Sequence, residues 1–138
     1  MIMIRKADHV SLLVTDVARS LDFYTRVLGM QETPRPQSFD FPGAWLNTTG
    51  FQIHLIGEQV AGRTKQTHPG YNEDELALGR GTHVAFEVDD LAATQQHLRE
   101  QGIELVGGPR PRGDGVQQMY ICDPDGYVIE LFAWENAH

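Results

Sequence analysis

The chain has 138 residues, a length that suits one compact domain or two small packed halves but not two independent cores of ordinary size. Its net charge of −8, with 11 basic and 19 acidic residues and no long arginine or lysine cluster, argues against nucleic acid as a partner. No apolar run approaches the roughly 18 residues that a membrane helix needs, and the single cysteine, Cys122, cannot form an internal disulfide. We therefore expect a soluble, cytoplasmic protein with no membrane partner.

The sequence contains a repeat, because two segments carry the same pattern of residues. Residues 8–17 read DHVSLLVTDV and residues 82–91 read THVAFEVDDL, with His9 in register with His83. In both segments apolar residues occupy alternate positions, which is the period of a half-buried strand. Each segment therefore predicts a strand that opens one half of the chain, with its histidine on the face opposite the apolar side chains.

A helix is expected after each opening strand. Asp16 and Asp90 are suited to cap a helix N-terminus, and apolar residues at helical spacing follow them. Gly29 and Gly102 supply the expected stops, since glycine readily adopts the conformation that ends a helix.

Further short strands are expected to close each half. They include residues 44–46 and 52–56 in the first half, and residues 118–121 and 127–132 in the second. The segment that joins the last two, residues 123–126, reads DPDG and suits a type I turn. Each half is thus predicted to form a β-α-β-β-β unit.

The predicted organisation is a single α+β domain over residues 1–138. The first repeat covers about residues 7–57 and the second about residues 81–134. Residues 58–80 show little periodicity and are interpreted as a connector, with a short helical turn at 73–78.

Strand phase places four potential metal ligands at equivalent positions of the two halves. His54 and Glu130 both lie on the face opposite the aliphatic residues of their closing strands. His54 follows His9 by 45 residues, and Glu130 follows His83 by 47. If an approximate two-fold axis relates the halves, all four side chains converge on one point.

Such a cluster suits one divalent metal ion. Imidazole nitrogens with one carboxylate oxygen are ligands for zinc, nickel, manganese, iron or cobalt, and four of them on an octahedral ion leave two positions for water or substrate. A lone histidine on a strand is more often structural, but four such residues at repeat-equivalent positions favour a metal site. His68, His97 and His138 lie outside the pattern, and the first two are expected to be solvated.

Three segments resemble the vicinal oxygen chelate superfamily. They are residues 9–16 (HVSLLVTD), 20–30 (SLDFYTRVLGM) and 123–131 (DPDGYVIEL), and the resemblance extends over about residues 7–134. This superfamily includes glyoxalase I, fosfomycin-resistance proteins, methylmalonyl-CoA epimerase, extradiol dioxygenases and bleomycin-binding proteins.

The resemblance implies a fold and a chemistry. Proteins of this superfamily pair their βαβββ units into an open, cup-shaped mixed sheet around a metal ion, within one chain or across a dimer. The ion chelates neighbouring oxygens of a small-molecule substrate. For this chain the resemblance implies that His9, His54, His83 and Glu130 hold the ion and that the protein is a homodimer.

Glyoxalase I is the most similar branch, especially over residues 21–30. It predicts a divalent-metal-dependent lyase or isomerase in which Glu130 acts as the base that moves a proton. Departures from glyoxalase I are His54, which stands where that enzyme has a glutamate, and Leu13 and Glu58, which stand where residues that help to hold glutathione are common.

Other classes remain open. They are a non-catalytic small-molecule or antibiotic-binding resistance protein, a fosfomycin-type thiol transferase and a ring-cleavage dioxygenase. Fosfomycin-resistance proteins rely on an arginine beyond the glutamate strand, whereas no arginine or lysine follows Glu130 here.

The segment before the second expected strand is rich in aromatic residues. Phe39, Phe41 and Trp45 are interpreted either as the lining of an apolar substrate pocket or as side chains packed under the sheet. Arg35 in the same segment is a candidate for holding an anionic group.

Overall fold

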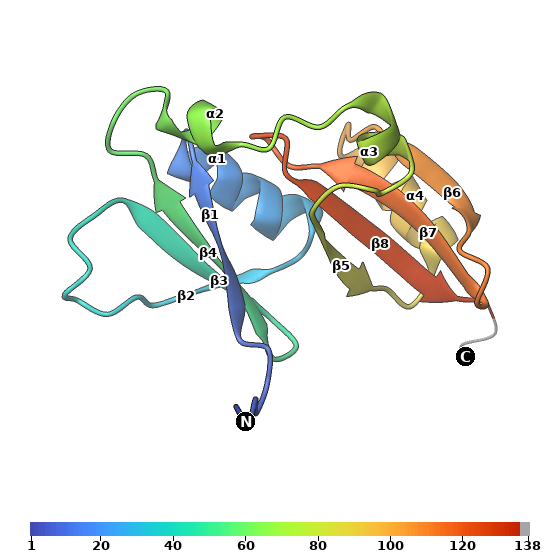
Figure 1. The fold of residues 1–138 in the computed structure, drawn as a ribbon, viewed down its shortest axis with the longest axis horizontal. Coiled ribbons are helices and arrows are strands. Elements are labelled where there is room, and N and C mark those ends of the chain that lie inside the picture. The colour runs from blue at the N-terminus through green and yellow to red at the C-terminus, as the bar shows by residue number, and fades with distance from the viewer. Residues whose placement is uncertain (136–138) are drawn as a thin grey trace. The chain divides into compact units, whose positions relative to one another are not determined.

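The chain divides between His68 and Pro69 into two units, and each has the β-α-β-β-β order predicted for a repeat. Figure 1 shows the elements of this computed structural model, whose described part covers residues 1–135. His138 therefore lies outside the described residues. Among residues 1–135, no helix combines the length and the apolar character that crossing a membrane requires.

The first unit contains a four-stranded mixed sheet with the strand order β1-β4-β3-β2. Strand β1 runs parallel to β4, and the other neighbouring pairs are antiparallel. Its elements are β1 (His9–Val14), α1 (Val17–Asp22), a π-helical turn (Phe23–Val27), β2 (Gln31–Thr33), β3 (Gly43–Thr48) and β4 (Phe51–Gly57).

The second unit repeats this topology, with the strand order β5-β8-β7-β6. Strand β5 is parallel to β8, and the remaining pairs are antiparallel. Its elements are β5 (His83–Glu87), α4 (Leu91–Glu100), β6 (Gly107–Pro111), β7 (Val116–Cys122) and β8 (Val128–Trp134). The predicted α+β class and the two βαβββ units are confirmed.

The helix that follows the opening strand of each unit starts and ends as the sequence predicts. The Asp16 carboxylate accepts a hydrogen bond from the Arg19 backbone N–H at 3.1 Å, and the Asp90 carboxylate accepts one from that of Ala93 at 3.0 Å. Gly29 and Gly102 have φ values of +69° and +75°, a left-handed conformation that costs glycine little. The repeat therefore uses the same local devices twice.

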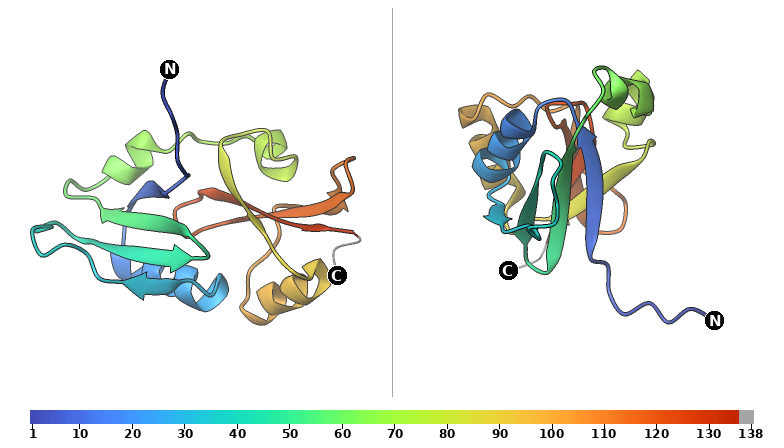
Figure 2. Two further views of the ribbon diagram at one scale, coloured as in Figure 1. Left: turned by 90° about the horizontal axis from the view of Figure 1, so that it is seen from below. Right: turned by 90° about the vertical axis from the view of Figure 1, so that its left-hand side faces the viewer.

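The core of each unit lies between the sheet and its helix. Helix α1 contacts β3 and β4 (Figure 2), and α4 contacts β8. The strand residues that are at most 2% exposed include Ala44, Leu46, Ile53, Leu55, Met119, Ile121, Ile129 and Leu131. Because side chains alternate along a strand, His54 and Glu130 lie on the other face of their sheets, as predicted.

The connector contains a helix that the sequence did not predict, α2 (Arg63–Thr67). The Glu58 carboxylate accepts hydrogen bonds from the backbone N–H groups of Thr64 at 2.8 Å and Gly62 at 3.3 Å. These bonds hold the pKa of Glu58 below its ordinary value. Glu58 thus anchors the start of α2, and its partner lies too far along the chain for the usual capping pattern to reveal it.

The predicted helical turn at 73–78 is present as α3 (Glu73–Ala77). A capping box starts it, because the Asn72 side chain accepts from the Glu75 backbone N–H and the Glu75 carboxylate accepts from that of Asn72. His68 and His97 are half-buried, so the expectation that they are solvated was wrong.

Candidate metal centre

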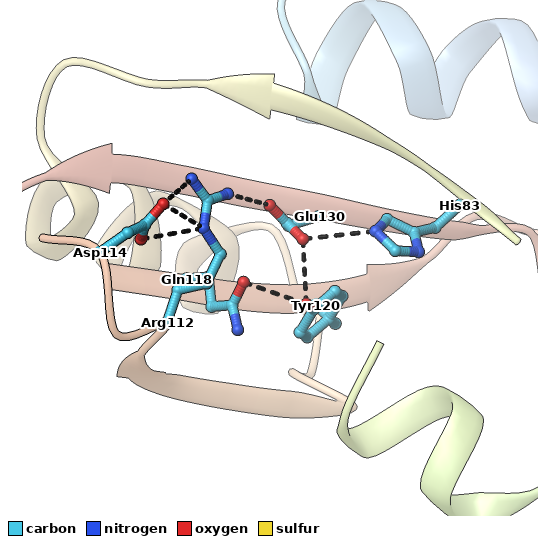
Figure 3. A network of polar contacts seen from close by, with 6 residues as sticks. All are labelled: His83, Arg112, Asp114, Gln118, Tyr120 and Glu130. Carbon is cyan, nitrogen blue, oxygen red and sulfur yellow. Dashed lines mark hydrogen bonds and ion pairs between the residues drawn. The ribbon is translucent and has the colours of Figure 1, made fainter. Parts of the chain in front are cut away.

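The second unit brings His83 and Glu130 into contact. His83 begins β5, and Glu130 lies on the adjacent strand β8. The distance from His83 Nε2 to Glu130 Oε1 is 3.3 Å, and Figure 3 shows the two side chains facing each other. Glu130 is only 4% exposed, so its carboxylate is largely removed from water.

A hydrogen bond fixes the tautomer of His83. Its Nδ1 lies 2.8 Å from the backbone carbonyl oxygen of Gly81, and a carbonyl oxygen can only accept. Nδ1 therefore carries a proton, and Nε2 is the nitrogen that faces Glu130 and can offer a lone pair. Two acceptors at this distance repel unless a cation, either a proton or a metal ion, joins them.

Glu130 also receives a hydrogen bond from Tyr120, the residue directly opposite it on β7. The Tyr120 hydroxyl lies 2.9 Å from Glu130 Oε1 and 3.1 Å from Gln118 Oε1. Burial and the bond to Glu130 raise the pKa of Tyr120 to about 12, so the hydroxyl is protonated at neutral pH and can donate.

The second carboxylate oxygen of Glu130 faces an arginine. Arg112 Nη1 lies 3.5 Å from Glu130 Oε2, a long contact for an ion pair. Asp114 holds the same guanidinium more tightly, with Arg112 Nη2 donating to its carboxylate at 2.8 Å. Figure 3 shows this polar network extending across the sheet from His83 to Asp114. Arg112 comes from the β6–β7 connection, not from beyond the glutamate strand.

In the first unit, the opening histidine is oriented in the same way. His9 Nδ1 lies 2.8 Å from Asp8 Oδ2, and a carboxylate oxygen accepts the Nδ1 proton. Nε2 is then the nitrogen with the free lone pair, as in His83. A carboxylate that orients a histidine through its other nitrogen is common around protein metal ions.

His54 is held differently. Its ring stacks on Trp45 with a centroid distance of 4.1 Å and an interplanar angle of 4°, and on His9 with 3.9 Å and 14°. Its Nε2 lies 2.7 Å from Gln52 Oε1, so the Gln52 amide holds this edge of the ring. Burial, with a smaller contribution from His9, lowers the pKa of His54.

The stacking of His9 and His54 limits how they can bind one ion. The lone pair of an imidazole nitrogen lies in the plane of its ring, and these two planes are almost parallel. The two lone pairs therefore do not meet at one point. One of the rings has to turn out of the stack before both can ligate the same ion.

These contacts test how well the predicted ligands fit a metal ion. Two ligands about 2.1 Å from one zinc ion, at angles between a right angle and a tetrahedral one, are about 3.0–3.4 Å apart, which includes the His83–Glu130 separation of 3.3 Å. Within each unit, the described residues supply no third His, Cys, Asp or Glu to either pair. His83 with Glu130 thus fits directly, and His9 with His54 fits after one ring turns.

Tyr120, Gln118 and Arg112 were missed in the sequence, although a signal for Tyr120 was present. Counting back from the turn at residues 123–126, the antiparallel register places Tyr120 opposite Glu130. Arg112 had no comparable signal, because its reach depends on the course of the β6–β7 connection.

The aromatic residues before and in β3 lie on the face of His54. Phe39 contacts Phe41 at 5.2 Å and Trp45 at 5.6 Å between ring centroids, and Trp45 pairs with His54 in the sheet register. Trp45 packs on the face of the sheet away from the helix, because the helix-facing positions of β3 are Ala44 and Leu46.

Arg35 is engaged in holding its own loop. Its Nη2 donates to the backbone carbonyl oxygens of Phe41 at 2.6 Å and Phe39 at 3.3 Å, and the guanidinium lies over both phenyl rings. We therefore interpret Arg35 as a structural clamp of this loop.

The sequence of residues 6–131 matches the model of the Glyoxalase/Bleomycin resistance protein/Dioxygenase superfamily. The chain belongs to this superfamily. The match spans both units, which agrees with the family that the three sequence segments indicated.

Curated relatives of this superfamily member include lyases. The chain is 32% identical to the lactoylglutathione lyase of Escherichia coli O157:H7 over 136 residues, covering 94% of this chain and 93% of that protein. It is 33% identical to "Glyoxylase I 4" of Arabidopsis thaliana over 127 residues, covering 90% of this chain and 68% of that protein.

Solved structures of the superfamily share the fold. A putative glyoxalase family protein from Bacillus anthracis aligns with a TM-score of 0.73 and 26% identity, covering 96% of this chain and 98% of that one. The fosfomycin resistance protein FosX from Listeria monocytogenes aligns with a TM-score of 0.70 and 20% identity, covering 95% of this chain and 94% of that one. At this identity the alignment shows only that the two chains share a fold.

Proposed function

We propose that this protein is a divalent-metal-dependent lyase or isomerase of the glyoxalase type, acting on a small molecule with neighbouring oxygen atoms. The observation that carries the proposal is the His83–Glu130 pair, in which an imidazole nitrogen and a carboxylate oxygen face each other at 3.3 Å. The match to lactoylglutathione lyases along nearly the whole chain supports the reaction class.

His9, His54, His83 and Glu130 would hold one divalent ion, which is zinc, nickel, manganese, iron or cobalt. When bound, such an ion polarises substrate oxygens and stabilises the negative charge that develops when a neighbouring carbon loses its proton. We also propose that the protein is a homodimer, and light scattering tests this separately.

Glu130 is the proposed general base. It is buried, it lies beside His83, and within residues 1–135 its second oxygen has only the long contact to Arg112. A carboxylate in this setting can accept a proton from substrate on one oxygen while the other stays oriented by Tyr120. His54, held against Trp45, is proposed to influence rate and substrate preference more than proton transfer.

The test begins with elemental analysis of protein purified without chelator and reconstituted with each candidate metal. The loaded protein is then assayed with hemithioacetals of α-ketoaldehydes and glutathione, and in parallel with fosfomycin plus thiols and with catechols plus dioxygen. Isomerisation of a hemithioacetal supports the proposal. Turnover of fosfomycin or catechol alone would replace it with transferase or oxygenase chemistry, and tight ligand binding without metal would favour a non-catalytic binding protein.

A further inference from the structure

The repeat extends to a third pair of residues, which face the closing-strand ligands. Trp45 is paired with His54 across β3 and β4, and Tyr120 is paired with Glu130 across β7 and β8. In each unit an aromatic side chain therefore lies directly opposite the proposed ligand, on the same face of the sheet.

The chemistry of each aromatic residue matches its partner. Trp45 offers a flat apolar face to the imidazole of His54, and the rings stack within 4° of parallel. Tyr120 offers a hydroxyl to the carboxylate of Glu130 at 2.9 Å. A flat ring is suited to orient imidazole, and a hydrogen-bond donor is suited to orient an anion.

The Tyr120 hydroxyl has one proton and two neighbouring acceptors, Glu130 and Gln118. The carboxylate is charged and closer, so it is the stronger acceptor. The oxygen that receives this bond, Oε1, is also the one that faces His83 Nε2. The hydroxyl thus acts on the oxygen proposed to meet the metal.

The phenol ring of Tyr120 is confined on several sides. The residue is 2% exposed, the Arg110 guanidinium lies 5.4 Å from the ring centroid, and His83 meets the ring edge-on at 5.6 Å. A side chain at Gly79 would overlap the phenol. Because these contacts hold the ring in place, the hydrogen bond from its hydroxyl orients the Glu130 carboxylate.

We infer that Tyr120 is the positioning residue of Glu130, holding Oε1 beside His83 so that the carboxylate is set for metal binding before the ion arrives. This inference rests on the proposed function. Tyr120 acts through Glu130, and Trp45 is its counterpart for His54 in the other repeat.

The experiment measures zinc affinity by chelator competition in the full chain. Tyr120→Phe removes only the hydroxyl, and we expect zinc binding to weaken about tenfold, the low end for losing an outer hydrogen bond to a ligand. Tyr127→Phe, which removes a tyrosine hydroxyl in the same unit, is the matched control and should bind zinc like the wild type. Circular dichroism and thermal unfolding establish that each variant is folded.

A double-mutant cycle separates positioning from a structural role. In a Glu130→Ala background, adding Tyr120→Phe should change zinc affinity less than twofold, because the group that Tyr120 orients is gone. The same tenfold loss in both backgrounds, or the same loss in Tyr127→Phe, overturns the inference. If the wild type binds zinc and Tyr120→Phe binds it equally well, the positioning role alone is overturned. If the wild type does not bind zinc, the proposed metal site and this inference are overturned together.

Discussion

The imidazole rings of His9 and His54 lie nearly parallel, with their centroids 3.9 Å apart. Their lone pairs consequently point along separate planes. Loading of one metal ion by both residues has to open the stack, and the change should reach Trp45, which lies against the other face of His54.

Trp45 should therefore report metal binding through its fluorescence. In a Trp134→Phe variant, Trp45 is the only tryptophan, and a titration with zinc should change its emission with the stoichiometry of metal binding. The complementary Trp45→Phe variant retains Trp134 and should show little change. Zinc binding with unaltered Trp45 emission would mean that His54 stays stacked on Trp45 and is not the ring that turns.

Replacing Glu130 with Gln should separate binding from catalysis. The amide keeps an oxygen donor and nearly the same volume but cannot act as a base, so we expect moderately weaker metal affinity and turnover reduced about 10²–10⁴-fold. Steady-state kinetics on metal-saturated protein measure this. Glu104→Gln, at an exposed carboxylate of the same unit, is the control. Full activity of Glu130→Gln would remove Glu130 from the proton-transfer role.

Tyr120 and Glu130, which face each other across β7 and β8, show how much of the site can be predicted from the sequence alone. The period of two along a strand was enough to assign the face of Glu130, and the helix caps Asp16 and Asp90 followed from local chemistry. Tyr120 could have been placed from the turn, but only by carrying the register through it. Arg112 could not be placed in this way, because the position of its long side chain depends on the path of the β6–β7 connection.

A second feature that the sequence did not predict is the orientation of the His9 and His54 rings. The sequence placed His9 and His54 on matching strands, but which ring nitrogen is free depends on Asp8 and Gln52. Stacking on Trp45 is likewise decided by side-chain packing that a strand pattern does not contain. The sequence therefore predicts which residues share a face and not how their rings are turned.

His54 should titrate below its ordinary pKa of about 6.5 in the metal-free protein, because burial and the neighbouring His9 disfavour its charged form. Asp8, which favours the charged form, acts in the opposite direction. In the window between the folded and ordinary pKa values the unfolded chain binds more protons, so stability falls as pH falls through it. NMR titration of the ring protons measures the shift, and His54→Phe should remove this contribution. A pKa at or above the ordinary value would contradict the buried, stacked environment.

The two helix caps should contribute similar stability because they are repeat equivalents. Asp16→Ala and Asp90→Ala each remove an acceptor from a backbone N–H near the helix start, and each should cost about 1 kcal/mol of unfolding free energy. Urea unfolding measures this cost, with Asp16→Asn and Asp90→Asn as cap-retaining controls. A loss from the asparagine variants as large as that from alanine would show that the caps act through charge alone.

The metal content of the wild-type protein beside that of His83→Ala tests the proposed metal centre most directly. After reconstitution with zinc, nickel, manganese or iron(II) and removal of excess metal, we expect close to one ion per site in the wild type. We expect a substantial loss in His83→Ala and no loss in His97→Ala, a control on α4 outside the proposed site. Negligible metal in the wild type with every ion, or the same metal content in His83→Ala, would contradict the proposed metal centre.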